Sequence, residues 1–161
     1  MTDRRASATT RLPLPAERAW DLVTDVRNHA RWIPFTRIDA AHPLRVGDTF
    51  SAATGPAGAL HRLSLVDRMT VTATTPPTTT PPRAGRATYR KLGPVRGGGA
   101  EVLVEPAGPG ASTVTWVEDI HVRGLPRWAV AWVSRPMATL MVRSALRKVR
   151  AEAVAAVGNR P

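Results

Sequence analysis

Between residues 36 and 122 the chain is a succession of short strand-like segments joined by short or proline-rich links. The segments are rich in Val and Thr, as strands typically are. The links at 55–58 and 107–110 carry the Gly and Pro of tight turns. Parallel strands need crossovers of about a dozen residues or more, so these links favour an antiparallel meander. The predicted strands are 36–41, 48–54, 62–74, 86–92, 100–105 and 112–122.

The residues before the meander predict one further strand and two short helices. Residues 5–12 alternate loosely between small side chains and Thr or Arg, which favours a strand. Pro15 suits the first position of a helix, and the apolar positions 16, 19, 20 and 23 then lie on one helical face. Asp25 caps a second short helix, 26–32, which Pro34 ends.

A long amphipathic helix is predicted for residues 125–157. Apolar residues recur at helical spacing from 125 to 133 and again from 142 to 157, and Gly158 provides a stop. Pro136 removes one backbone hydrogen bond, so a kink or break is expected near residues 132–135. The meander and this helix together predict an α+β fold, a curved sheet of about six or seven strands packed against the helix.

The chain of 161 residues has the length of a single domain, predicted to span 1–161. Residues 75–85 contain four prolines and predict an exposed, mobile loop inside that domain. There is no cysteine, which excludes disulfides and thiol chemistry. No apolar run reaches the roughly 18 residues of a membrane span, and no signal peptide is evident at the start. A cytoplasmic protein is therefore expected.

The formal net charge is +11, from 23 basic and 12 acidic residues. Most of the surplus lies in residues 83–161, which carry 13 basic and 5 acidic side chains. Such a surplus fits nucleic-acid or anionic-membrane partners, with Arg143, Arg147, Lys148 and Arg150 as the contact face. A helix packed on a sheet leaves that face in water in any case, so we do not expect a nucleic-acid partner.

Strand alternation identifies the residues that face the helix. Two of the inward rows are mainly apolar but each includes one carboxylate, Asp67 in the strand 62–74 and Glu118 in the strand 112–122. A lone buried carboxylate is costly, so each requires a partner, a raised pKa or a wet cavity.

Several segments resemble the START/polyketide cyclase superfamily, also called SRPBCC. The stretches L-P-A-E-R-A-W-D-L-V-T-D (14–25) and N-H-A-R-W-I-P (28–34) resemble its N-terminal signature. R-K-L-G-P-V (90–95), A-E-V-L-V-E-P (100–106) and T-V-T-W-V-E-D-I (113–120) resemble its late strands. The resemblance covers residues 10–157. It implies the helix-grip fold and a small hydrophobic ligand bound between the sheet and the long helix, as in lipid carriers and polyketide cyclases.

No motif predicts a metal, a cofactor or a nucleophile. The four histidines, at 29, 42, 61 and 121, lack metal-ligand spacing, and His29 is expected to pack near the second helix. The serines lack a G-x-S-x-G elbow. The glycine run 96–100 has no following Lys-Ser/Thr, so we interpret it as a turn or bulge at a strand entry.

The acid/base candidates are Asp67 and Glu118, with Tyr89 as a possible donor. Carboxyls that face an apolar cavity can have pKa values suited to proton transfer, as cyclisation or dehydration of a poly-ketone requires. The alternative interpretation is structural: each carboxylate forms a salt bridge with a neighbouring Arg.

Three functions remain open on the sequence. The first is binding of a lipid-like or aromatic polyketide ligand, the second a polyketide cyclase/dehydratase activity, and the third the basic surface described above. Aromatic and Met side chains are as typical of plain core as of a pocket. The predicted pocket residues are Trp32, Phe50, Leu65, Asp67, Met69, Tyr89, Val102, Trp116, Glu118, Trp132, Met137 and Met141.

Overall fold

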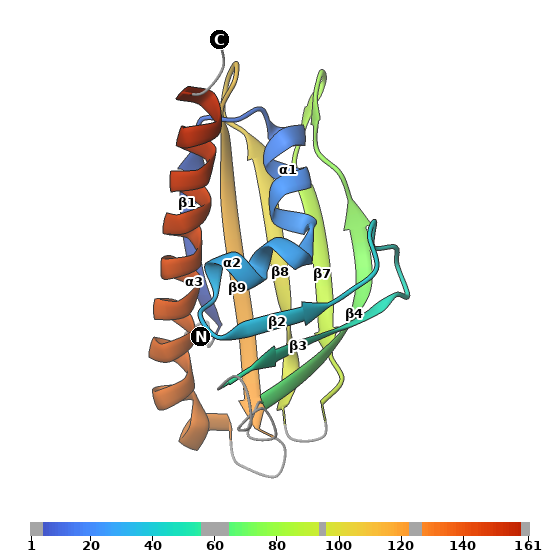
Figure 1. The fold of residues 1–161 in the computed structure, drawn as a ribbon, viewed down its shortest axis with the longest axis vertical. Coiled ribbons are helices and arrows are strands. Elements are labelled where there is room, and N and C mark those ends of the chain that lie inside the picture. The colour runs from blue at the N-terminus through green and yellow to red at the C-terminus, as the bar shows by residue number, and fades with distance from the viewer. Residues whose placement is uncertain (1–4, 56–64, 94–95, 123–126, 159–161) are drawn as a thin grey trace.

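The computed structural model describes residues 5–55, 65–93, 96–122 and 127–158, with the backbone alone at 65, 96, 121–122 and 127–134 (Figure 1). The chain begins with β1 (Ala6–Leu12), α1 (Ala16–Thr24), the 3-10 turn η1 (Val26–Asn28) and α2 (His29–Trp32). The strands that follow are β2 (Thr36–Asp39), β3 (Thr49–Thr54), β4 (Leu65–Thr75), β5 (Thr78–Thr79), β6 (Pro82–Arg83), β7 (Gly85–Lys91), β8 (Arg96–Pro106) and β9 (Ser112–Val122). The last element is the long helix α3 (Arg127–Gly158).

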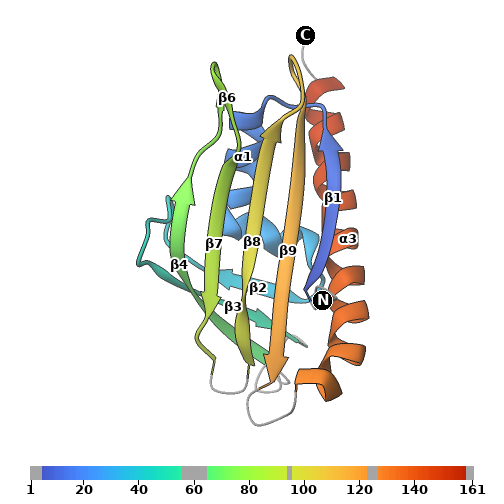
Figure 2. The ribbon, with the colours of Figure 1, turned by 180° about the vertical axis from the view of Figure 1, so that it is seen from behind.

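Seven strands form one antiparallel sheet in the order β1-β9-β8-β7-β4-β3-β2. The sheet curls, so β2 and β3 run obliquely to the longer strands. The helices α1 and α2 lie across its concave face, while α3 runs along the side formed by β1 and β9 (Figures 1 and 2). The prediction of a curved antiparallel sheet, two short helices after the first strand and a long C-terminal helix is confirmed.

The glycine run lies inside a strand and not in a turn before one, because β8 already begins at Arg96. Gly98 has a φ of +118°, a conformation that favours glycine. A Cβ built there would lie 2.1 Å from the backbone oxygen of Asp119 on β9. Glycine therefore allows β8 and β9 to pair closely at this point.

The proline-rich segment forms a small hairpin, in which β5 pairs with β6. The Thr79 hydroxyl donates to the Glu17 carboxylate of α1 at 2.5 and 2.7 Å. Pro77 and Trp20 fill the space where a side chain of Gly85 would be. The segment is thus docked on α1, and its predicted mobility stays a prediction.

The helix α3 is continuous through Pro136, so the predicted break does not occur. A proline in a helix leaves one carbonyl without its usual donor, but the remaining hydrogen bonds and the packed face hold the helix together. The inward face of α3 includes Val142, Leu146 and Val149, which are buried against the sheet. No helix among the described residues is long and apolar enough to cross a membrane.

Candidate functional site

A cavity of about 90 Å³ lies between the concave face of the sheet and the helices α2 and α3. It has room for several water molecules. Apolar side chains form most of its wall, and the charged groups of the wall lie on β4, β7 and β9. The wall consists of Val26, His29, Ile33, Thr36, Ile38, Phe50, Ala52, Thr54, Asp67, Met69, Tyr89, Lys91, Ala100, Val102, Trp116, Glu118, Ile120 and Met141.

Eight of the predicted pocket residues line this cavity, namely Phe50, Asp67, Met69, Tyr89, Val102, Trp116, Glu118 and Met141. Two others do not. Met137 is 67% exposed on the outer face of α3, and Trp32 is buried in the core, where its indole N–H donates to Glu152 at 3.0 Å. The side chains of Leu65 and Trp132 lie outside the described residues. The part of these residues in ligand binding stays a prediction.

The two predicted carboxylates meet around Lys91, which the sequence analysis did not single out. Lys91 Nζ lies 2.6 Å from Asp67 Oδ2 and 3.4 Å from Glu118 Oε2. All three side chains are buried, with residue exposures of 5–8%. The structural interpretation expected a neighbouring arginine as the partner of each carboxylate, but the partner of both is Lys91. The lysine comes from β7, between the strands of the two acids.

Lys91 reaches Glu118 across an intervening strand. Glu118 on β9 is paired with Ala100 on β8, and Ala100 is paired with Tyr89 on β7, two residues before Lys91. Because Ala100 carries only a methyl group, nothing at this level of β8 blocks the long lysine side chain. A small residue in the inward row is thus what allows the ion-pair cluster to form.

Electrostatics inside the cluster raise the pKa of both Lys91 and Glu118. Burial raises the pKa of Glu118, and the nearby Lys91 ammonium offsets this only in part. Burial alone would lower the pKa of Lys91, but the charges of Glu118 and Asp67 outweigh it and raise that pKa. A permanently protonated lysine is not a nucleophile, so its place here is to stabilise negative charge.

Two acceptor oxygens of the cluster have no hydrogen-bond partner among the described residues. They are Asp67 Oδ1 and Glu118 Oε2. The other Glu118 oxygen accepts a hydrogen bond from the indole N–H of Trp116 at 3.3 Å. Since Asp67 and Glu118 both line the cavity, these oxygens provide acceptor capacity beside an otherwise apolar space.

Tyr89 and His29 complete the polar side of the cavity. The Tyr89 ring packs edge-on against Phe50, and burial raises its pKa to about 12, so the hydroxyl remains a donor. His29 packs against Trp116 and Trp32, near the second helix as expected. Burial lowers the pKa of His29 to about 4, so its ring is neutral at pH 7. Its Nε2 donates to the Val23 carbonyl at 2.9 Å, which leaves Nδ1 as an acceptor.

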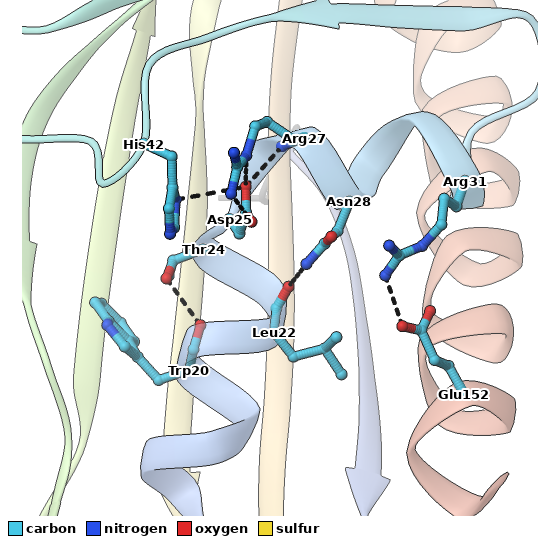
Figure 3. A network of polar contacts seen from close by, with 9 residues as sticks. All are labelled: Trp20, Leu22, Thr24, Asp25, Arg27, Asn28, Arg31, His42 and Glu152. Carbon is cyan, nitrogen blue, oxygen red and sulfur yellow. Dashed lines mark hydrogen bonds and ion pairs between the residues drawn. The ribbon is translucent and has the colours of Figure 1, made fainter. Parts of the chain in front are cut away.

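Polar contacts fix the helices that cover the cavity (Figure 3). At the junction of α1 and η1, Asp25 accepts hydrogen bonds from the backbone and the guanidinium of Arg27. The Asn28 side chain donates to the Leu22 carbonyl at 2.8 Å. Farther along, Arg31 of α2 pairs with Glu152 of α3 at 2.6 Å. These contacts connect η1 and α2, which provide Val26 and His29 of the wall, to α1 and α3.

Within the described ranges, no group of three or more His, Asp or Glu side chains is arranged to hold a metal ion.

A family model described as polyketide cyclase/dehydrase and lipid transport matches residues 3–154. The chain belongs to this polyketide cyclase/dehydrase family. The predicted resemblance is confirmed. Among curated protein sequences, none matches the chain significantly.

Solved structures similar to this family member share its fold at low identity. An aromatase/cyclase from a Streptomyces species, Zhui, is 17% identical, with 95% of this chain and 94% of that chain covered and a TM-score of 0.62. A hypothetical protein from Helicobacter pylori is 14% identical, with coverages of 94% and 89% and a TM-score of 0.72.

A third similar structure has two domains. It is the aromatase/cyclase StfQ from the steffimycin biosynthetic pathway, 11% identical with a TM-score of 0.69. The match covers 96% of this chain but 51% of StfQ, so the chain spans about half of that protein. Identities this low establish the helix-grip fold alone, and polyketide cyclase/dehydrase folds serve several chemistries.

Sequence reasoning missed Lys91, His29 and Ala100 as cavity residues of this family member. A signal for Lys91 was present, because it has the same strand parity as Tyr89 and Ala87. It is also one of only two lysines in a chain whose other basic residues are all arginine. No sequence signal marked Ala100 as the small residue that leaves space between Lys91 and Glu118. That role depends on which residues are neighbours across three strands.

Proposed function

We propose that the protein binds a small, mainly apolar molecule, lipid-like or an aromatic polyketide, in the cavity between the sheet and the helices α2 and α3. The observation that supports this most directly is a largely enclosed space with an apolar wall in the middle of the fold. Each methylene group buried there would contribute roughly 0.8 kcal/mol, so useful affinity requires no catalytic group.

Native mass spectrometry of freshly purified protein, paired with a dye titration, tests this binding. We expect a co-purified small molecule, or saturable binding of the neutral dye N-phenyl-1-naphthylamine with enhanced emission. Ala52 lines the cavity and Ala53 is the next residue on β3, on the opposite face of the strand. Ala52→Leu should reduce dye binding at least about tenfold by filling the space, whereas Ala53→Leu should leave it unchanged. Equal binding by both variants would place the dye elsewhere.

A second candidate is a cyclase or dehydratase activity at the same site. Its support is the buried cluster, in which Asp67 Oδ1 is free to accept a proton, while Glu118 has a pKa raised by burial and can donate one. In such a reaction Asp67 removes a C–H proton between two carbonyls, and the resulting enolate attacks a third carbonyl. Glu118 or Tyr89 protonates the alkoxide that forms, which gives a hydroxyl group; removal of a second C–H proton next to a carbonyl and protonation of that hydroxyl then release it as water and leave a C=C bond.

Turnover of a poly-ketone by matched variants distinguishes this activity from binding alone. Asp67→Asn, Glu118→Gln and Tyr89→Phe should each lower the rate, by about a hundredfold or more for the essential base. Asp119→Asn, on the other face of β9, serves as the control. Full turnover by Asp67→Asn and Glu118→Gln would remove these residues from the mechanism, and binding measured in parallel shows whether the cavity is intact.

A further inference from the structure

The polar side of the cavity has an uneven balance of donors and acceptors. One ammonium group, Lys91, faces two carboxyl groups, and its shortest contact is to Asp67 Oδ2. Asp67 Oδ1 remains without a hydrogen bond among the described residues, and Glu118 Oε2 has only its ion-pair contact with Lys91 at 3.4 Å. Both residues are more than nine-tenths buried and line the cavity. The unused capacity at this place is therefore for accepting hydrogen bonds.

This imbalance restricts what can occupy the cavity. A buried acceptor left without a donor costs far more than an ordinary hydrogen bond contributes, and the cost is greater for a charged acceptor. An occupant that is apolar throughout would displace water from these oxygens and give nothing in return. A carboxylate in the same position would bring its own acceptor oxygens against the Asp67 carboxylate, with Lys91 already engaged.

We propose that the ligand joins an apolar body to a hydrogen-bond-donating head group, an alcohol, a phenol or an amine, that contacts Asp67 and Glu118, and that the site rejects carboxylates. This inference rests on the proposed function and adds the chemical class of the ligand to it. The apolar body lies against Phe50, Val102 and Met141, while the head group points to the cluster.

A series of four compounds on one naphthalene skeleton tests the head group by isothermal titration calorimetry. They are 2-methylnaphthalene, 2-naphthol, 2-naphthylmethylamine and 2-naphthoic acid. We expect the tighter of 2-naphthol and the amine to exceed 2-methylnaphthalene by about ten- to a hundredfold, as a hydrogen bond to a charged group implies. The acid should bind more weakly than the hydrocarbon. Whichever donor binds more tightly identifies the head group as hydroxyl or amine.

Variants test whether the preference for hydrogen-bond-donating ligands depends on the cluster of Asp67, Lys91 and Glu118. Asp67→Asn replaces one acceptor oxygen by an amide N–H₂, so the advantage of the donor compounds over the hydrocarbon should shrink to under about threefold. Asp119→Asn is the matched control on the opposite face of the sheet, and it should keep the wild-type order. If Asp67→Asn does not fold, the order of the four compounds on the wild-type protein decides alone.

The outcomes separate this inference from the proposed function. If 2-methylnaphthalene or 2-naphthoic acid binds as tightly as the better donor, the head-group inference is overturned, while binding of an apolar molecule stands. If none of the four compounds binds and N-phenyl-1-naphthylamine fails as well, both proposals are overturned. A donor preference that persists unchanged in Asp67→Asn also overturns the assignment to this cluster.

Discussion

On β9 the inward-facing Val114 is completely enclosed by the core, whereas Glu118, four residues along the same row, faces the cavity. The same change occurs on β7, from Ala87 to Lys91, and on β4, from Val71 to Asp67. We call the first region the packed end of the sheet and the second the hollow end. The β8–β9 pairing is continuous through both ends, whereas the β4–β7 pairing shifts register between Val71 and Ala73.

The contrast shows how a protein keeps a cavity open. At the packed end, apolar side chains from the sheet, α1 and α3 form one buried core, to which Leu12 and Val149 belong. At the hollow end, Ala52 and Ala100 leave space, and a buried ion-pair cluster occupies the wall where further apolar side chains would otherwise close it. Buried charges contribute little net stability, so this cluster supports the proposed site better than it supports a purely structural role.

Removing the lysine of the hollow end should have the largest effect on stability. Lys91→Met leaves two buried carboxyls without their cation, which should cost about 3–5 kcal/mol of unfolding free energy at pH 8. Because the carboxyls can take up protons, the loss should be smaller at pH 5. Urea unfolding at the two pH values measures this.

The other lysine provides the control for this variant. Lys148 is exposed on α3, and Lys148→Met should change stability by less than about 0.5 kcal/mol. If Lys91→Met were as stable as the wild type at pH 8, the ion-pair cluster would be dispensable, and the packed and hollow ends would differ in shape only.

Truncating an apolar side chain should be costly at the packed end and milder at the hollow end. Leu12 is 0% exposed, and Leu12→Ala should lose about 2–5 kcal/mol through lost burial and a new void. Met69 is only partly buried and already borders the cavity, so Met69→Ala should lose less than half as much. Chemical denaturation of both variants tests the difference, and equal losses would mean that the cavity wall is packed as tightly as the core.

The sequence predicts the packed end better than the hollow end, for a physical reason. Strand alternation and helical spacing are local patterns, so the sheet, the helices and the inward position of Asp67 and Glu118 follow from them. The Lys91 cluster depends on three strands meeting in register over Ala100, which no local pattern contains.

Three features of the structure do not follow from local sequence patterns. Pro136 breaks a helix in isolation, but in α3 the packed inward face compensates. Met137 follows the apolar pattern of α3, yet the rotation of the helix turns its side chain to solvent. The hairpin of β5 and β6 is stabilised by Glu17 and Trp20, which are distant in sequence. In each case a tertiary contact overrides or replaces a local preference.

His29 lines the cavity and packs against Trp32 and Trp116 of the core. Its protonation should make the stability of the protein depend on pH. Burial lowers its folded-state pKa to about 4, so the unfolded chain binds more protons between about pH 4 and 6.5. Stability should therefore fall as the pH drops through this window, by up to about 3 kcal/mol from this residue. The raised pKa of Glu118 acts in the opposite direction, because it gives stability that is lost as pH rises.

A variant isolates the histidine contribution. His29→Gln keeps an N–H donor toward the Val23 carbonyl but does not titrate, so its stability should vary less than that of the wild type between pH 4 and 6.5. The wild-type protein, measured in parallel, is the reference. Thermal unfolding across this range measures both, and parallel curves for His29→Gln and the wild type would mean that the ring takes up its proton without unfolding.

The smallest effect is expected for the exposed ion pair between α2 and α3. Arg31 and Glu152 lie 2.6 Å apart, but their side chains are 55% and 39% exposed, so solvent screens their attraction. Arg31→Gln should lower the unfolding free energy by less than about 1 kcal/mol, and the difference should shrink in high salt.

The same carboxylate also accepts the indole N–H of the buried Trp32 at 3.0 Å. Glu152→Gln keeps an oxygen for that bond, whereas Glu152→Ala leaves the indole N–H without this acceptor. The alanine variant should therefore be the less stable of the two, and the gap should not respond to salt. If Arg31→Gln instead lowered the unfolding free energy as much as Lys91→Met, exposed and buried ion pairs would contribute equally to stability. The buried cluster at the hollow end would then not differ electrostatically from a surface ion pair.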